Sequence, residues 1–149
     1  MRAWTALLRA NASAARVLSA GLEAEHGLTL NDYEALQALA DAEGRRLKRV
    51  DLARRLVLTP SGVTRLLEGL ESVGLVERAA CESDLRVTYA QLTDAGADRL
   101  EAASCGHEGS IRALFEGRLS DGELVALAEA LERLSGLGDP TEDEGNGFG

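Results

Sequence analysis

Apolar residues recur at three- and four-residue intervals in six segments of the chain, which is the spacing of one buried helical face. The segments run over residues 2–23, from Asn31 to Gly44, over 49–57, from Thr59 to Gly74, from Thr93 onward, and from Ser120 to Gly136 or Gly138. Between them, residues 75–79 and 87–92 alternate like the strands of a hairpin, and the basic stretch 45–49 is a candidate edge strand. The pattern therefore predicts a mainly helical protein with a small β-hairpin.

Capping residues predict where the helices begin and end. Gly27 suits the position after a C-cap, and we interpret His26 beside it as a capping residue at the carbonyl end of the first helix. Asn31 followed by Glu34 is expected to cap the second helix. A full S-x-x-E capping box, residues 120–123, predicts the start of the sixth.

The fourth helix carries the most informative pattern. Thr59 is an N-cap residue, and the fixed φ of Pro60 suits the first helical position. The expected buried face is formed by Val63, Leu66, Leu67, Leu70 and Val73. The other face begins with the small or polar residues Ser61, Gly62 and Thr64, followed by Arg65. Such a helix can insert its first turn into a groove, which is the geometry of a DNA recognition helix.

A hairpin that directly follows a recognition helix can act as a wing whose tip lies in the minor groove. Arg86, near the predicted tip, is the candidate contact, because a narrow minor groove concentrates negative potential. Asp84 could orient the guanidinium of Arg86 through a bidentate pair. It could equally be an acidic residue that favours the turn.

The net charge of −9 argues against a nucleic-acid partner until its distribution is considered. Residues 1–43 carry three Arg against six acidic residues, and residues 91–149 carry four Arg against thirteen. Residues 44–90 carry nine Lys or Arg against six acidic residues, a balance of +3. The one basic segment is therefore the one that holds the predicted recognition helix and wing.

Composition excludes several other classes of protein. Apolar residues make up 45% of the chain but aromatic ones only 3%, which favours a helical core of Leu, Ala and Val. The chain lacks a run of about 18 apolar residues and a signal-peptide layout, so we expect a cytoplasmic protein without membrane contact. It also lacks a Gly-rich phosphate loop, an HExxH motif and a plausible catalytic triad. We therefore expect neither an enzyme nor a bound cofactor.

The two cysteines, Cys81 and Cys105, have no CxxC spacing, and two free thiols are favoured over a disulfide. Cys105 and His107 point to different sides of a helix, which makes them a poor metal-chelating pair, and no metal site is expected. We interpret Cys105 as a small buried side chain and His107 as a hydrogen-bonded seam residue. Gly106 and Gly109 are expected to bend or loosen this helix.

Two segments together resemble the MarR (multiple antibiotic resistance regulator) family of winged helix-turn-helix transcription factors. They are LTPSGVTRLLEGLESVGLVER (58–78) and the wing end D-x-R, Asp84 and Arg86, followed by LTDAG (92–96). The resemblance implies a homodimer, joined through its first and last two helices, that binds a pseudo-palindromic operator in double-stranded DNA. It also implies that Ser61, Gly62, Thr64 and Arg65 read the major groove and that Arg86 enters the minor groove.

The resemblance further implies a domain organisation and a regulated function. Residues 1–28 would form an N-terminal dimerisation helix, 29–92 the winged helix-turn-helix domain, 93–136 the C-terminal dimerisation helices and 137–149 a disordered acidic tail. Members commonly repress their targets and are released by small, often phenolic, ligands. The residues that could line such an effector pocket are Trp4, Tyr33, His26 and His107.

Two departures from the family pattern bear on function. Val57 stands where the turn before the recognition helix often carries Gly, and the wing tip holds Cys81, Glu82 and Leu85 instead of more basic residues. The reactive N-terminal cysteine of redox-sensing members is missing, although Cys81 leaves a thiol-responsive regulator open. A winged-helix module for protein–protein contact is a further alternative.

Overall fold

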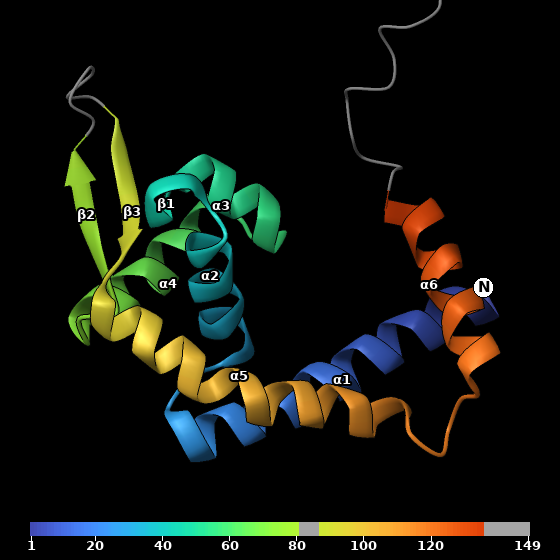
Figure 1. The fold of residues 1–149 in the computed structure, drawn as a ribbon. Helices are drawn as coiled ribbons and strands as arrows, with labels where there is room; N and C mark the ends of the chain where they lie inside the picture. The colour runs from blue at the N-terminus through green and yellow to red at the C-terminus, as the bar shows by residue number, and fades with distance from the viewer. Residues whose placement is uncertain (81–86, 136–149) are drawn as a thin grey trace, which may run out of the picture. The chain divides into compact units, whose positions relative to one another are not determined.

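The computed structural model describes residues 1–80 and 87–135 (Figure 1). Its elements are α1 (Arg2–His26), α2 (Leu30–Ala40), the 3₁₀ turn η1 (Glu43–Arg45), β1 (Arg46–Lys48), α3 (Arg49–Leu56), α4 (Pro60–Ser72), β2 (Val76–Ala80), β3 (Thr88–Leu92), α5 (Asp94–Phe115) and α6 (Asp121–Ser135). The predicted fold class, mainly helical with a small β-hairpin, is confirmed. The chain divides into two units, the first ending at Ile111 and the second beginning at Arg112.

The first unit contains a three-helix cluster and a small antiparallel sheet. The strand order is β1-β3-β2, so the central strand β3 comes last along the chain (Figure 1). Leu47 lies opposite Ala90, and Val76 lies opposite Leu92. The basic stretch predicted as an edge strand is therefore confirmed as β1, and it pairs with a segment more than forty residues away in sequence.

The core of this unit is aliphatic, as the composition predicts. Its largest fully buried side chains come from the α1–α2 connection and from α2, α3 and α4: Leu28, Leu36, Leu39, Leu52, Val63 and Leu67. Each removes an apolar side chain from water, which stabilises the fold by about 1.5–3 kcal/mol per residue. This core packs α2, α3 and α4 against one another, while the opposite face of α4 remains exposed.

Hydrogen bonds join the start of α5 to the connection between α4 and β2. The Thr93 hydroxyl donates to the Gly74 carbonyl at 2.7 Å, and the Thr93 amide donates to the Leu75 carbonyl at 3.2 Å. The Thr93 side chain also accepts from the amide of Gly96 and so caps the helix. A Cβ on Gly96 would lie 2.1 Å from the Leu75 carbonyl oxygen, so only glycine fits this contact. The LTDAG segment thus joins the α4–β2 connection, the sheet and α5.

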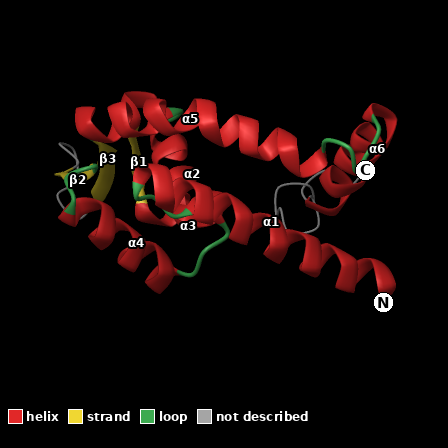
Figure 2. Cartoon of the chain, turned by 90° about the horizontal axis from the view of Figure 1, so that it is seen from below, coloured by secondary structure: helices red, strands yellow, loops and turns green. Residues whose placement is uncertain are grey.

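The C-terminal half of α1 packs against α5 within the first unit (Figure 2). Leu18 and Leu22 are buried there, and an Arg99 guanidinium nitrogen donates to the His26 carbonyl at 2.7 Å. Gly27 ends α1 at φ 66°, which confirms its predicted position. The N-terminal half of α1 keeps apolar side chains in solvent: Trp4 is 60% exposed and Leu8 49%.

The second unit is described from Arg112 to Ser135. The predicted capping box is confirmed, because the Ser120 amide donates to a Glu123 carboxylate oxygen at 2.8 Å and the Glu123 amide donates back to the Ser120 hydroxyl at 3.4 Å. The first of these bonds lowers the pKa of Glu123. Most of the predicted α6 seam lies at the surface, with Leu127 and Leu131 each 39% exposed and Leu134 53%.

Two local predictions are wrong. The second helix is capped by Thr29 and Asp32, which bond reciprocally, and not by Asn31 and Glu34, so the helix begins at Leu30. Val73 is not on the buried face of α4: the helix ends at Ser72, and Val73 is 66% exposed.

The fifth helix is continuous over its 22 residues and runs through Gly106 and Gly109, where the sequence predicts a bent or loosened stretch. The Ser110 hydroxyl donates to the Gly106 carbonyl at 3.0 Å within this stretch. The predicted tail, residues 137–149, lies outside the described residues.

Candidate nucleic-acid interface

The leading turn of α4 is built by its N-cap. The Thr59 hydroxyl accepts from the Gly62 amide at 3.1 Å and lies 3.2 Å from the Ser61 hydroxyl. Pro60 occupies the first helical turn, as predicted. The Thr64 hydroxyl donates to the Pro60 carbonyl at 3.0 Å. These bonds hold the short polar side chains of the turn in place before any partner binds.

Gly62 has a steric reason to be glycine. A Cβ there would lie 3.2 Å from the Thr59 hydroxyl oxygen, which is closer than most such contacts. A larger residue would therefore press against the cap, and it would also widen the narrow leading end of the helix. The spacing of the sequence motif did not reveal this contact.

The turn that precedes α4 adopts a strained conformation. Val57 lies in the left-handed region at φ 53° and is 90% exposed. A β-branched residue rarely adopts this conformation, which favours glycine. The residue type at this position departs from the family pattern, while the backbone adopts a conformation that glycine favours.

Several basic side chains around the helix already have partners. Both oxygens of Glu71 accept from the Arg78 Nε, at 3.1 and 3.0 Å, and this contact raises the pKa of Arg78. Arg46 lies over the Tyr89 ring at 4.9 Å. Arg65, by contrast, is exposed and has no hydrogen bond or ion pair with another described residue. It is therefore available to an external anion or base edge.

The wing is only partly described. Its two strands, β2 and β3, pair from Val76–Leu92 to Ala80–Thr88, which confirms the predicted hairpin. The predicted minor-groove residues, Asp84 and Arg86, and the thiol of Cys81 lie outside the described residues.

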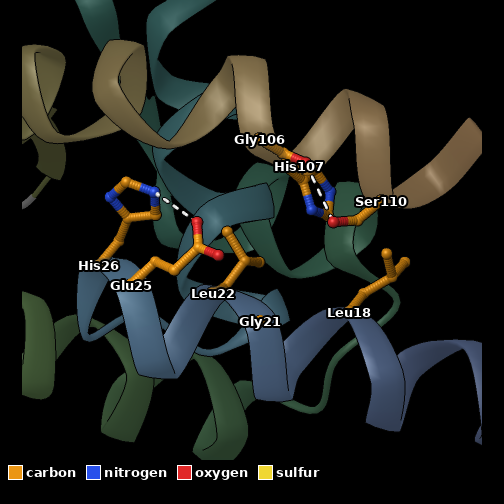
Figure 3. Close-up of a pocket in the computed structure, with 8 residues that line it drawn as sticks. All are labelled: Leu18, Gly21, Leu22, Glu25, His26, Gly106, His107 and Ser110. Carbon is orange, nitrogen blue, oxygen red and sulfur yellow. Dashed lines mark hydrogen bonds and ion pairs between the residues drawn. The ribbon is translucent and has the colours of Figure 1, made fainter.

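Three of the four predicted effector residues lie near the junction of α1, α2 and α5. The rings of Tyr33 and His107 are 4.2 Å apart, centroid to centroid, and the Tyr33 hydroxyl donates to the Ser104 hydroxyl at 3.2 Å. His26 and His107 both line a cavity of about 10 Å³ between α1 and α5 (Figure 3). Trp4 is not part of this cluster, because it lies about 20 Å along α1 from Leu18, the nearest residue of that lining.

The two histidines differ from their predicted roles. Backbone bonds from Gly27 and Leu28 cap the end of α1, while the His26 imidazole lies 3.7 Å from a Glu25 carboxylate oxygen. His107 is only 7% exposed, yet its Nδ1 has no hydrogen-bond partner, so the expectation of a hydrogen-bonded residue is wrong. Burial lowers the pKa of His107. This buried, unpartnered nitrogen was not detectable in the sequence.

Cys105, next to this cluster along α5, is exposed, and the expectation of a buried side chain is wrong. The helix turns Ala103 and His107 inward, and this places residue 105 on the solvent side. Among residues 1–80 and 87–135, no group of three or more His, Cys, Asp or Glu side chains could hold a metal ion. No helix in that part of the chain is long and apolar enough to cross a membrane.

Taken together, a capped helix with a free polar face follows a short helix and a tight turn, and a β-hairpin follows it. These are the parts of a winged helix-turn-helix DNA-binding domain. Comparison with known proteins agrees. A model of the MarR family matches residues 26–86.

Individual relatives extend the match to most of the chain. The HTH-type transcriptional repressor YetL of Bacillus subtilis is 36% identical over 116 residues, which cover 75% of this chain and 69% of that protein. The MarR family regulator AbsC of Streptomyces coelicolor is 33% identical, with a TM-score of 0.82 and 90% of both chains covered.

A second Streptomyces coelicolor regulator, Sco3205, was solved in complex with DNA. It is 29% identical, with a TM-score of 0.86 and coverage of 95% of this chain and 89% of that one. The chain belongs to the MarR family and is a transcriptional regulator of the winged helix-turn-helix class, a class of DNA-binding proteins rather than enzymes.

Proposed function

We propose that this regulator binds a pseudo-palindromic operator as a homodimer and represses transcription until a small aromatic effector releases it. The observation that carries the proposal is the leading turn of α4, where Ser61 and Arg65 are exposed on a capped, rigid helix. In this proposal the turn enters the major groove, with contacts from Thr59, Pro60, Ser61, Gly62, Thr64 and Arg65. Asp84 and Arg86 of the wing are proposed contacts to the adjacent minor groove.

A homodimer is proposed because α4 of a single copy offers few contacts to DNA. Arg65 is the only cationic side chain on α4 itself, so one copy offers few contacts. Two copies spaced by about 34–36 Å would read two half-sites one helical turn apart. Exposed apolar side chains on the terminal helices, such as Trp4, Leu131 and Leu134, supply a surface that a second copy would cover.

The dimer is tested by measuring its mass in solution. We expect light scattering after size exclusion to give twice the chain mass of 15.8 kDa. Leu131→Asp, which places a charge within the proposed interface, should give a monomer and weaken operator binding. An exposed change elsewhere, Glu77→Gln, should leave the mass unchanged. A monomeric mass for the unaltered chain would refute the dimer.

Repression, rather than activation, is supported by the name of YetL, a repressor in Bacillus subtilis. DNA binding is supported by Sco3205, which was solved with DNA. A reporter fused to a bound promoter would distinguish repression from activation: repression predicts that deletion of the regulator raises expression.

The proposed effector site is the junction around His107. Tyr33 contacts His107 through its ring, and it also lines a groove of about 570 Å³ along α2 and the end of α3. The cavity beside His107 has room for about one water molecule, so a larger ligand would have to separate α1 from α5. A phenol or aromatic carboxylate could hydrogen-bond to the free Nδ1 and stack on Tyr33. Such a ligand would couple its binding to the position of the terminal helices.

This site is tested with a panel of monocyclic phenols and aromatic carboxylates. A compound that releases DNA from the unaltered protein should do so at least tenfold less well with His107→Phe. Glu43→Gln, an exposed change in η1 outside the cluster and the terminal helices, should not alter the response. Equal release from the His107 variant would place the effector elsewhere.

DNA recognition itself is tested by Arg65→Ala. We expect specific operator affinity to fall by about 1–3 kcal/mol, with a smaller effect on non-specific DNA. Arg112→Ala removes the same charge outside the first unit and serves as the control. If operator binding survives Arg65→Ala undiminished, α4 does not read the operator.

A salt titration separates DNA binding from the alternative of a protein-contact module. Phosphate contacts predict that the logarithm of the affinity constant falls steeply and linearly with the logarithm of salt concentration. A flat response on duplex DNA would favour the protein-contact alternative.

A further inference from the structure

The exposed face of α4 extends one turn beyond the residues that the family resemblance assigns to DNA reading. Glu68 is exposed and belongs to this face. At about 100° per residue, Ser61, Thr64, Arg65 and Glu68 fall within an arc of about 100°, opposite the buried Val63, Leu67 and Leu70. Glu68 lies between Thr64 and Arg65 in angle, about 10 Å along the axis from Ser61.

This spacing is that of a complete major-groove reading surface. The homeodomain recognition helix reads bases with four residues at i, i+3, i+4 and i+7. Residues 61, 64, 65 and 68 of this chain have the same spacing, so a helix that places Ser61 and Arg65 against the bases brings Glu68 to the same groove. Figure 2 shows α4 along one side of the unit, with α5 on the other side.

A second glutamate on the same helix provides a contrast. Glu71 has a side chain that is 22% exposed, and Arg78 binds both of its oxygens. Glu68 has no such clamp: in the described part of the chain it forms no ion pair, and none joins it to Arg65. The negative charge of Glu68 makes a minor contribution to the raised pKa of Arg78. Glu68 therefore has acceptor oxygens that no other described residue uses.

Chemistry restricts what such a carboxylate can contact in DNA. An ionised carboxylate only accepts hydrogen bonds, and phosphates repel it. In the major groove, guanine presents acceptors, and thymine presents an acceptor and a methyl group. Cytosine presents the N4 amino donor, whereas adenine presents its N6 donor beside the N7 acceptor, which repels a carboxylate. A glutamate on a reading face accordingly pairs with cytosine and disfavours guanine and thymine.

We propose that Glu68 is a specificity-determining residue that selects a C·G base pair in each half-site by accepting a hydrogen bond from cytosine N4. The inference rests on the proposed placement of α4 in the major groove. The selected base pair lies further along the groove than the one that Arg65 reads, because Glu68 is nearly one turn further along the helix.

The test is selection of bound duplexes from a random pool by the unaltered protein, by Glu68→Gln and by Glu71→Gln. The unaltered protein should enrich a symmetric motif with cytosine at one fixed position in each half-site. Glu68→Gln should lose that preference and gain adenine there, because an amide pairs with adenine N6 and N7. Every other position of the motif should be unchanged.

Binding to defined duplexes then gives the magnitude. Replacing the selected C·G pair by T·A should weaken the unaltered protein by about 5- to 150-fold, the range of one good base contact. The same replacement should change the affinity of Glu68→Gln by less than threefold. Thermal unfolding confirms that both variants are folded. Glu71→Gln, which loosens Arg78 and not the reading face, should retain the cytosine preference.

Two results would overturn the inference. One is an unchanged motif with Glu68→Gln, whether affinity stays the same or rises uniformly through lost repulsion of phosphate. The other is an equal change of base preference with Glu71→Gln, which would mean that the Arg78 cluster and not Glu68 sets the preference. If the unaltered protein enriches no motif, the major-groove placement of α4 fails first, and that outcome is recognisable without either variant.

Discussion

Replacing Gly96 by alanine should disrupt the joint between the α4–β2 connection and α5. The added Cβ would lie 2.1 Å from the Leu75 carbonyl oxygen and 2.7 Å from the Leu92 Cδ1. The first of these atoms belongs to the backbone, so it cannot rotate away as a flexible side chain can. Relief of the clash requires α5 to move away from the α4–β2 connection.

The cost can be worked out from the contacts that this movement affects. Overpacking of a close contact costs about 1–3 kcal/mol. The Thr93 amide donates to the same Leu75 carbonyl at 3.2 Å, and loss of that bond adds about 0.5–1.5 kcal/mol. We therefore expect Gly96→Ala to lower the free energy of unfolding by roughly 2–4 kcal/mol, a large part of the 5–15 kcal/mol typical of a domain.

The assay is urea unfolding followed by circular dichroism, with all variants at one protein concentration because a dimer would couple stability to concentration. Gly69→Ala is the control, since a Cβ at this exposed position of α4 meets nothing within 4 Å. It should raise stability by about 0.5–1 kcal/mol through helix propensity. If Gly96→Ala is as stable as the unaltered protein, α5 does not start against Leu75 and the reasoning is refuted.

Three further changes test other local features. Val57→Gly should stabilise the fold by about 1 kcal/mol in the same assay, because it relieves left-handed strain at φ 53°. The control Val50→Gly should destabilise the fold by a similar amount, because glycine disfavours the helix α3. Thr59→Ala should cost about 1 kcal/mol by removing the α4 cap, whereas Thr59→Ser should retain it; equal losses would contradict the capping role. Burial lowers the pKa of His107 from 6.5, so the neutral form favours folding: stability should be full above pH 6.5 and fall as the pH drops below it. Unfolding at pH 7.5 and 5.5 should show this fall for the unaltered protein and a smaller one for His107→Phe, and equal falls would assign the pH dependence to other groups.

Much of the exposed leading face of α4 could be predicted from the sequence because it depends on local interactions. Thr59 and Pro60 determine where α4 starts, and the spacing of Val63, Leu67 and Leu70 determines which face is buried. Ser61 and Arg65 are then exposed by geometry alone. The capping box of α6 could be predicted for the same reason, because its partners, Ser120 and Glu123, are only three residues apart.

The exact ends of the helices were harder to predict than their existence. Thr29 and Asn31 are both good N-cap residues, and the burial of Leu28 decides between them by fixing where the chain enters α2. At the end of α4, Val73 continues the apolar periodicity but is exposed, because the helix has already ended. Periodicity identifies the helix and its face, and it does not locate the last residue.

The remaining features depend on contacts between segments far apart in the chain. The pairing of β1 with β3, the close approach of Gly96 to Leu75 and the clamp of Glu71 on Arg78 join residues whose separation carries no local signal. The unpartnered Nδ1 of His107 likewise depends on how three helices meet. The sequence alone determined the class of protein and the position of α4, because short-range capping and periodicity encode them. The tertiary structure decided which side chains remain free to act, because that depends on what the rest of the fold places beside them.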